Sequence, residues 1–332
     1  MEHLTQKIGT KDAVLHACLI GLDKLQNNMP KRPAVLIFPG GSYEFCSPWE
    51  DEPVALAFMA EGYQAFTLYY SVSKDPKEQV FPRVFEEAEE ALCTIREHAE
   101  EWNVDPKRIA VIGFSAGGHL AAYLSAAGKE KPNVTILGYP RIFGSKPGEE
   151  RFVPDAAEAV DRNTPPAFIF GTREDEAVGP LHGMAYAAAL QKQHILYEIH
   201  YFEHGGHGMV LGKSWSANGF GPACNPAFSR WFPMCIDWLR LRFGDFPLRE
   251  PENRIASRSP TMDMPLEFLL EDEAKKRILF DTVPAFGGVL QINRDAVNDF
   301  TINRIALVLK QLFPKDVMET LDARFLTLDG SD

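Results

Sequence analysis

The chain has 332 residues, which exceeds one minimal domain and fits a large α/β domain with an appendage. Its formal net charge is −12 with no cluster of lysine and arginine, which argues against nucleic acid or an anionic membrane as a partner. The first ten residues lack the features of a secretory leader, no apolar run reaches membrane-spanning length, and the five cysteines are scattered. We therefore expect a cytoplasmic protein with reduced thiols.

Strand-like and helix-like segments alternate along the first 245 residues. Continuous apolar runs of strand length predict strands buried on both faces, and apolar residues three or four apart predict amphipathic helices. In chain order we expect a strand within 11–21, a polar turn at 23–28, a strand over 32–38, a helix over 52–61, a strand over 62–70, a helix over 82–102, strands ending at 114 and 140, a strand over 165–172, a helix over 182–193, a strand over 194–202 and a helix over 227–243. This alternation predicts a mostly parallel sheet flanked by helices.

The segment from Ile109 to Ala122 combines an apolar strand, a Gly-x-Ser-x-Gly turn and an alanine-rich helix. Glycines at 113 and 117 fit a sharp bend in which a Cβ atom would collide with the strand and helix beside it. Ser115 then stands at the tip of the bend, where a nucleophile is accessible. An ordinary βα turn with an incidental serine is the alternative interpretation, and the strand and helix on either side argue against it.

A serine hydroxyl needs a base to take its proton, and that base needs a carboxylate to orient it. The acid is expected just after the strand that ends at Thr172, where the candidates are Glu174, Asp175 and Glu176. The base is expected after the last strand, where His204 and His207 both qualify. Glycines on either side of His207 let a loop bring its ring over the bend, whereas we expect His204 to be structural.

Amide groups for an oxyanion hole are expected at two places. The helix that begins at Ala116 offers its first N–H groups, and the glycine pair after the strand over 32–38 leaves Gly41 or Ser42 to supply the second donor. An ordinary loop after a strand is the alternative for the glycine pair.

Aromatic residues are candidates for substrate contact. Trp215 and Phe220 lie in the loop over 210–222, directly after His207, and Tyr43 follows the glycine pair. They could offer a flat face to a sugar ring, or they could simply cover the core.

The last part of the chain differs in character. Residues 246–262 mix proline, arginine and glutamate and predict a linker, and 263–332 contain amphipathic helices over 265–280, 301–312 and 315–328. About 70 helical residues bury little core alone, so we expect this module to dock on the main domain or on a second copy, forming a homodimer.

Several motifs together resemble the short bacterial α/β-hydrolases grouped with acetyl-xylan esterases and feruloyl-esterase-like enzymes. The resemblance covers about 35–242 and rests on Pro39 to Tyr43, Gly113 to Ala122, Gly138 to Pro140, Gly171 to Val178, and Gly205 to Met209 with Trp231. It implies an α/β-hydrolase fold with Ser115 as nucleophile, Asp175 as acid and His207 as base. Gly179 stands where the family usually has proline. This difference bears on the rigidity of the loop that follows Asp175, and not on the assignment of the acid. More weakly, the tail resembles a helical segment of some carbohydrate-active enzymes.

We therefore expect a serine carboxylesterase acting on acetyl or other short acyl esters of sugars or oligosaccharides. A peptidase of the same fold, and an esterase or lipase for non-carbohydrate esters, are the alternatives. The predicted chemistry needs no metal and no organic cofactor.

Overall fold

The computed structural model describes residues 1–9, 11–21, 31–145, 151–217, 219–247 and 253–330. The chain divides into two compact units, Met1–Phe246 and Pro247–Asp332, which are considered separately. The polar turn expected at 23–28, and residues 248–252 of the expected linker, lie outside the described residues.

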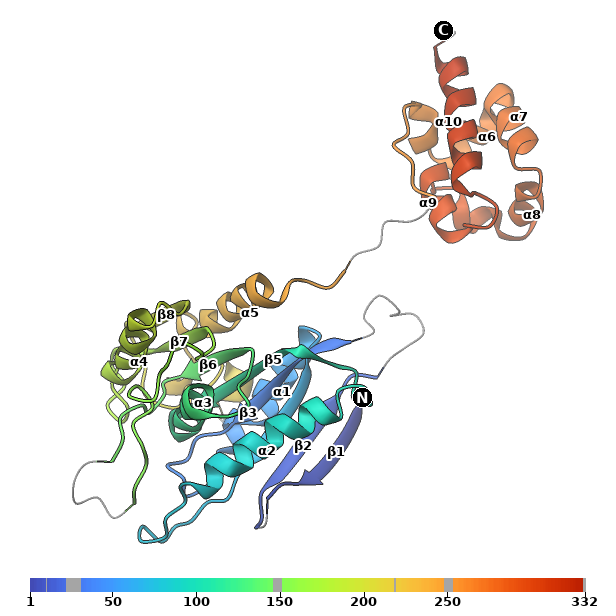
Figure 1. The fold of residues 1–332 in the computed structure, drawn as a ribbon. Helices are drawn as coiled ribbons and strands as arrows, with labels where there is room; N and C mark the ends of the chain where they lie inside the picture. The colour runs from blue at the N-terminus through green and yellow to red at the C-terminus, as the bar shows by residue number, and fades with distance from the viewer. Residues whose placement is uncertain (10, 22–30, 146–150, 218, 248–252, 331–332) are drawn as a thin grey trace. The chain divides into compact units, whose positions relative to one another are not determined.

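The first unit is built on one sheet of eight strands in the order β1-β2-β4-β3-β5-β6-β7-β8 (Figure 1). Strands β1, β2 and β4 pair antiparallel, and every pair from β4 to β8 is parallel. This confirms the predicted mostly parallel sheet. The strands are β1 (Glu2–Lys7), β2 (Val14–Leu19), β3 (Arg32–Phe38), β4 (Gln64–Tyr69), β5 (Val104–Phe114), β6 (Val134–Gly138), β7 (Ala167–Thr172) and β8 (Tyr197–Phe202).

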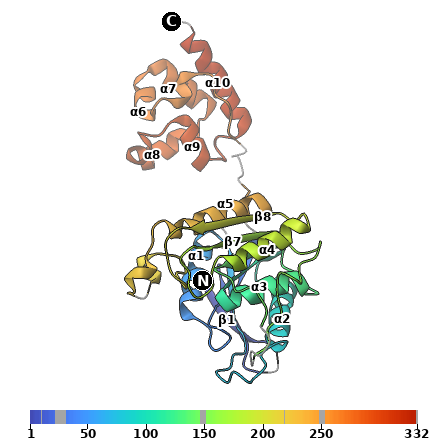
Figure 2. The ribbon, with the colours of Figure 1, turned by 90° about the vertical axis from the view of Figure 1, so that its left-hand side faces the viewer.

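Helices cover both faces of this sheet (Figures 1 and 2). Apolar residues of α2, α3 and α4 share one hydrophobic core with one face, and those of α1 and α5 share a second core with the other. Successive residues of β3 alternate between the two cores, as the pleat of a strand buried on both sides requires. The helices are α1 (Glu52–Ala60), α2 (Arg83–Glu97), α3 (Ser115–Ala127), α4 (Leu181–Lys192) and α5 (Trp231–Phe243).

Several segments of the first unit differ from the sequence-based expectation, among them β8, which begins at Tyr197 instead of 194. Strand β1 was not expected, because an edge strand with four of its six residues exposed has no continuous apolar run. Helix α2 ends at Glu97 instead of 102, where the N–H of His98 closes the last turn. Helix α5 begins at Trp231 instead of 227, because 228–230 form a 3₁₀ turn first.

The second unit contains five α-helices among its described residues: α6 (Leu266–Glu271), α7 (Glu273–Thr282), α8 (Phe286–Val297), α9 (Ile302–Val308) and α10 (Lys315–Asp329). The helix expected over 265–280 is broken between α6 and α7, where the Asp272 side chain accepts hydrogen bonds from the N–H groups of Ala274 and Lys275. Helix α8 was not expected.

The second unit has a hydrophobic core of its own. Its fully buried members come from all of the helices and the turns between them, among them Leu266, Leu279, Phe286 and Phe325. The expectation that the tail buries little core by itself is therefore wrong. The additional helix α8 and the turn residue Phe313 contribute the apolar surface that the sequence interpretation left out.

Candidate catalytic site

Ser115 begins helix α3 at the sharp bend after β5. Its φ angle is +52°, a left-handed conformation that costs free energy in a non-glycine residue and is typical of a nucleophile held at such a bend. A Cβ on Gly117 would lie 2.0 Å from the carbonyl oxygen of Phe38, and one on Gly113 would lie 2.1 Å from that of Gly117. The two glycines are thus required by the close approach of β3, β5 and α3.

Ser115, His207 and Asp175 are brought together from three separate loops at the carboxyl ends of the parallel strands. The Ser115 hydroxyl lies 2.8 Å from Nε2 of His207, and Nδ1 of His207 lies 2.7 Å from Oδ2 of Asp175. Since a carboxylate accepts, Nδ1 carries the proton and Nε2 is left to accept from the serine. This is the geometry of a base poised to deprotonate a nucleophile.

Asp175 is itself held rigidly. Its other oxygen, Oδ1, accepts hydrogen bonds from the N–H groups of Ala177 and Val178 at 3.0 and 2.8 Å, and its side chain is buried. These bonds orient the carboxylate toward His207 and compensate for part of its desolvation.

The other candidates for acid and base lie apart from Ser115. Nδ1 of His204 lies 3.0 Å from Glu174 in an exposed pair, in which Glu174 raises the pKa of His204 and His204 lowers the pKa of Glu174. Glu176 is exposed. Among the candidate acids and bases, only the side chains of Asp175 and His207 turn toward Ser115. Sequence spacing alone left this orientation open.

The expected oxyanion loop follows β3. Gly41, Ser42 and Tyr43 have φ angles of +126°, +57° and +62°, and a Cβ on Gly41 would lie 2.1 Å from the carbonyl oxygen of Phe45. Ser42, Ser115, Ala116 and His207 line one pocket. Among the described residues no protein acceptor is found for the N–H groups of Gly41 and Ser42, and the Ala116 N–H is in the first turn of its helix.

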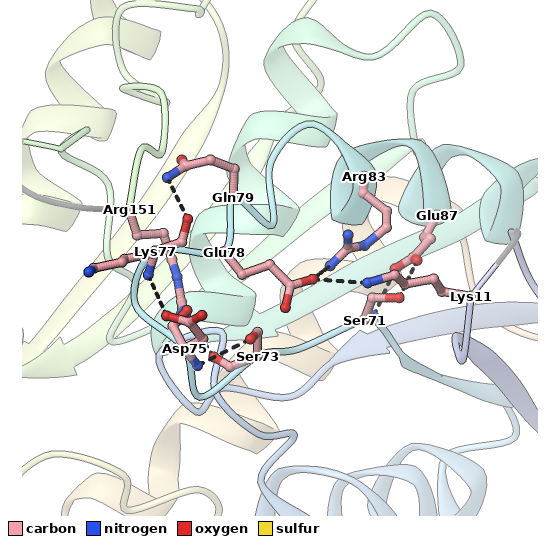
Figure 3. A network of polar contacts seen from close by, with 10 residues as sticks. All are labelled: Lys11, Ser71, Ser73, Asp75, Lys77, Glu78, Gln79, Arg83, Glu87 and Arg151. Atoms are coloured by element: carbon pink, nitrogen blue, oxygen red, sulfur yellow. Dashed lines mark hydrogen bonds and ion pairs between the residues drawn. The ribbon is translucent and has the colours of Figure 1, made fainter.

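Arg151 holds this loop from outside. Its Nη1 donates to the carbonyl of Ser42 at 3.2 Å, and its Nη2 donates to the carbonyls of Ser73 and Asp75 at 2.7 and 2.8 Å. Figure 3 shows Arg151 beside Ser73 and Asp75. One guanidinium thus ties the oxyanion loop to the segment that follows β4.

The pocket at Ser115 has a volume of about 450 Å³ and is open to solvent. Its lining residues are Ser42, Ser115, Ala116, Arg141, Phe143, Gly144, Ala177, Val178, His182 and His207. The sequence interpretation singled out none of Arg141, Phe143 and His182 as site residues. Arg141 and Phe143 lie directly after β6, beside the end of β5, and this position was the available signal, since loops at adjoining strand ends share one edge of the sheet.

His182 supports one wall of the pocket. Its Nδ1 accepts hydrogen bonds from the N–H groups of Ile142 and Phe143 at 2.9 and 3.2 Å. Burial and the charge of Arg141 lower the pKa of His182, so the neutral ring that can accept these bonds is favoured. The ring of Phe143 packs on it at 4.4 Å between centroids.

None of the three aromatic candidates for substrate contact lines the described part of the pocket at Ser115. Tyr43 is 1% exposed, and its hydroxyl donates to Nδ1 of His119 at 2.7 Å, so the side chain belongs to the core. Trp215 and Phe220 are 56% and 64% exposed, and neither lines the pocket at Ser115 among its described residues. Aromatic character alone could not distinguish core, surface and mouth.

Neither a metal cluster nor a membrane-spanning helix is found in the described part of the chain. No three or more His, Cys, Asp or Glu side chains are placed to hold a metal ion there. No helix within the same residues is both long and apolar enough to cross a bilayer.

Two family models match adjoining parts of the chain. The model described as BD-FAE matches residues 22–139, and the model of the prolyl oligopeptidase family matches residues 143–216. Together these ranges include the oxyanion loop, Ser115 and Asp175.

Known proteins resemble this chain over part of its length. An α/β hydrolase enzyme from a Medee basin deep-sea metagenome library is 39% identical, with a TM-score of 0.68 over 73% of this chain and 97% of that chain. Endo-1,4-beta-xylanase B of Butyrivibrio fibrisolvens is 29% identical over 56% of this chain, and an acetylxylan esterase of Xylanibacter ruminicola is 26% identical over 55%. The matches span only 34% and 43% of the length of these two curated relatives.

Proposed function

We propose that this chain, which belongs to the α/β-hydrolase family, is a serine carboxylesterase for short acyl esters, and above all for acetyl esters of sugars or oligosaccharides. The observation that carries the proposal is the continuous hydrogen-bonded line from Ser115 through His207 to the buried Asp175, with bonds of 2.8 and 2.7 Å. Such a line supplies a nucleophile, a base and an orienting charge.

The first half of the reaction forms an acyl-enzyme. The Ser115 oxygen attacks the ester carbonyl carbon while Nε2 of His207 takes the hydroxyl proton, and Asp175 stabilises the imidazolium. His207 then returns that proton to the oxygen of the leaving alcohol as the bond between this oxygen and the acyl carbon breaks. In the second half, water attacks the acyl carbon in the same way, and Ser115 is released.

Backbone N–H groups stabilise the negative charge on the carbonyl oxygen in this mechanism. We assign the N–H of Ala116 and that of Gly41 or Ser42 to this role. Ala116 and Ser42 line the pocket, Gly41 directly precedes Ser42, and none of the three N–H groups has a protein acceptor among the described residues. Each donor in such a hole contributes about 3 kcal/mol to transition-state stabilisation in serine hydrolases.

The substrate class is supported by two observations. The pocket of about 450 Å³ is open and carries polar side chains, of which Ser42, Arg141 and His182 can hydrogen-bond hydroxyl groups. The relatives include one named an acetylxylan esterase and one named a xylanase. A small acyl group with a sugar as the alcohol is consistent with both.

A peptidase of the same fold is the second candidate. The match of residues 143–216 to the prolyl oligopeptidase family favours it, since the same three side chains can cleave an amide. Faster cleavage of short peptides than of acetyl esters would replace the esterase proposal.

The compartment is also a proposal. All five cysteines are free, which supports a reducing environment such as the cytoplasm.

Hydrolysis of p-nitrophenyl acetate, butyrate and octanoate, together with acetate release from acetylated xylo-oligosaccharides, tests the proposal. We expect rates that fall with acyl length, release of acetate from the oligosaccharides, and loss of at least about 10⁴-fold in kcat for Ser115→Ala. Hydrolysis of the nitrophenyl esters without acetate release would assign the enzyme to non-carbohydrate esters. Full activity in Ser115→Ala would contradict the mechanism.

A further inference from the structure

A second buried carboxylate lies beside the site and takes no part in the line from Ser115 to Asp175. Glu50 ends the short 3₁₀ turn Pro48–Glu50 and is 4% exposed. Burying a carboxylate is unfavourable unless hydrogen bonds and charges compensate for its lost hydration. Its partners therefore indicate what it is for.

Both oxygens of Glu50 accept strong hydrogen bonds. Oε2 accepts from the N–H of Gly40 at 2.6 Å, and Oε1 accepts from the hydroxyl of Tyr139 at 2.8 Å. The Tyr139 oxygen in turn accepts from the N–H of Val210 at 3.2 Å, which leaves its own proton free for Glu50. One carboxylate thus connects the segment after β3 with Tyr139, which follows β6, and through Tyr139 with the segment after β8.

Each of these partners lies next to a residue of the candidate catalytic site. Gly40 directly precedes Gly41, and a Cβ on Gly40 would lie 2.8 Å from Oε2 of Glu50 and 3.0 Å from Cβ of Ser115. Val210 lies three residues after His207, and the ring of Tyr139 packs edge-on against the His207 ring at 5.0 Å between centroids. Glu50 is therefore adjacent to the nucleophile, the oxyanion loop and the support of the base.

The oxyanion loop needs such support because its backbone is strained. Ser42 and Tyr43 both have positive φ angles, and a left-handed conformation in a non-glycine residue persists only where its surroundings enforce it. The Gly40 N–H bonded to Glu50 lies immediately before these residues. Loss of that bond would let the loop relax away from the geometry in which its amides face the pocket.

We propose that Glu50 is a positioning residue for catalysis. It holds the oxyanion loop through Gly40 and the His207 loop through Tyr139, and so fixes the positions of both loops relative to Ser115. This inference rests on the proposed function, because it takes Gly41 or Ser42 as an oxyanion donor. Burial raises the pKa of Glu50. The hydrogen bonds from Tyr139 and Gly40, and the positive charge of His207 when that ring is protonated, oppose the rise.

Two variants of Glu50 separate its roles. Glu50→Ala removes both bonds, whereas Glu50→Gln keeps the shape: its carbonyl can accept from Gly40 and its amide can donate to the Tyr139 oxygen. Glu87 offers a matched control, because it is also buried and it accepts hydrogen bonds from the N–H and hydroxyl of Ser71 (Figure 3), whereas Glu50 accepts from Gly40 and Tyr139. We would compare Glu87→Ala with Glu50→Ala.

The first measurement is the second-order rate constant with which a fluorophosphonate labels Ser115 in each full-length variant. The second is kcat and KM of unlabelled enzyme on p-nitrophenyl acetate, with kcat expressed per site that the fluorophosphonate titrates. For Glu50→Ala we expect both the labelling rate and kcat to fall by about 100-fold with KM little changed, because the loop acts mainly in the transition state. Glu50→Gln should recover to within about tenfold. Glu87→Ala should lower thermal stability but label within about twofold of wild type.

Two results would overturn the inference: Glu50→Ala labelling within about twofold of wild type, or Glu50→Gln reacting as slowly as Glu50→Ala. Labelling needs no ester substrate, so a wild type that is labelled but hydrolyses no ester removes the proposed function and leaves this comparison valid. If Glu50→Ala does not fold, Tyr139→Phe tests the same connection, since it removes both the donor to Glu50 and the acceptor of Val210. Labelling of that variant at the wild-type rate would equally overturn it.

Discussion

The two units of the chain use buried carboxylates in different ways. In the first unit, Glu50 and Asp175 accept hydrogen bonds from loops that surround Ser115, at the ends of parallel strands. In the second unit, the buried Asp322 on α10 accepts from the N–H groups of Arg258 and Ser259, at 2.8 and 2.9 Å, and so fixes the segment that leads into the helices.

The difference lies in what the donors are attached to. A buried carboxylate needs several donors in either case, because desolvation of its charge is costly. Where the donors belong to loops around a nucleophile, removing the charge should change the rate of reaction. Where the donors belong to a segment packed on a helix, as in the second unit, removing the carboxylate should change only the stability of the second unit.

The largest effect is expected at Asp175. Asp175→Asn should lower kcat by about 10⁴-fold, because an amide favours the wrong tautomer of His207 while leaving the packing nearly unchanged. Steady-state hydrolysis of p-nitrophenyl acetate measures it. Glu174→Gln, one residue away and exposed, is the control and should stay within about twofold. A large loss in Glu174→Gln instead would mean that the wrong carboxylate has been assigned.

The next effect concerns stability and pH in the first unit. Burial lowers the pKa of His119 to about 4 from its ordinary value of 6.5. Between these pH values the unfolded chain binds a proton that the folded chain does not, so the free energy of unfolding falls as the pH drops from 6.5 toward 4. At pH 5 the loss attributable to this ring should be about 2 kcal/mol.

His119→Gln should remove that pH dependence, because glutamine has no proton to bind. Urea unfolding of both proteins at pH 7.5 and pH 5 measures the difference. The neutral ring donates from Nε2 to the Pro154 carbonyl and accepts from Tyr43, both at 2.7 Å. An identical pH dependence in the variant would show that other groups cause the acid sensitivity.

A smaller effect, confined to the second unit, is expected at Asp322. Asp322→Ala leaves the N–H groups of Arg258 and Ser259 without their acceptor and should cost about 1 to 3 kcal/mol of that unit's stability. Hydrogen exchange followed by peptide mapping would report faster exchange in the helices of the second unit. Hydrolysis of p-nitrophenyl acetate should not change, and a fall in kcat would link the two units functionally.

The smallest effect on chemistry is expected from removal of the second unit. We propose that this unit joins two copies of the chain, because its described surface includes Phe268, Ile292 and Val308, all more than half exposed. A chain that ends at Phe246 should hydrolyse p-nitrophenyl acetate within about twofold of the full chain. Light scattering should show the mass of a monomer for it and of a dimer for the full chain. Equal oligomeric states would contradict the proposal.

The sequence by itself determined the features that depend on short spacing. The apolar strand, the glycines at 113 and 117 and the helix after Ser115 are close in the chain, so sterics alone predicted the bend. The order of strands and helices predicted the parallel sheet, and with it the loops in which an acid and a base were sought. The family resemblance then selected Asp175 and His207.

Tertiary structure alone decided the contacts between residues far apart in the chain. Ser115 and His207 are separated by 92 positions, and Glu50 and Tyr139 by 89, so no local pattern reveals that they meet. The same holds for Tyr43, which packs inside, for His182, which supports the pocket wall, and for the core of the second unit. Burial depends on which surfaces pack together, and for this reason the role of Glu50 can be recognised only in the folded chain.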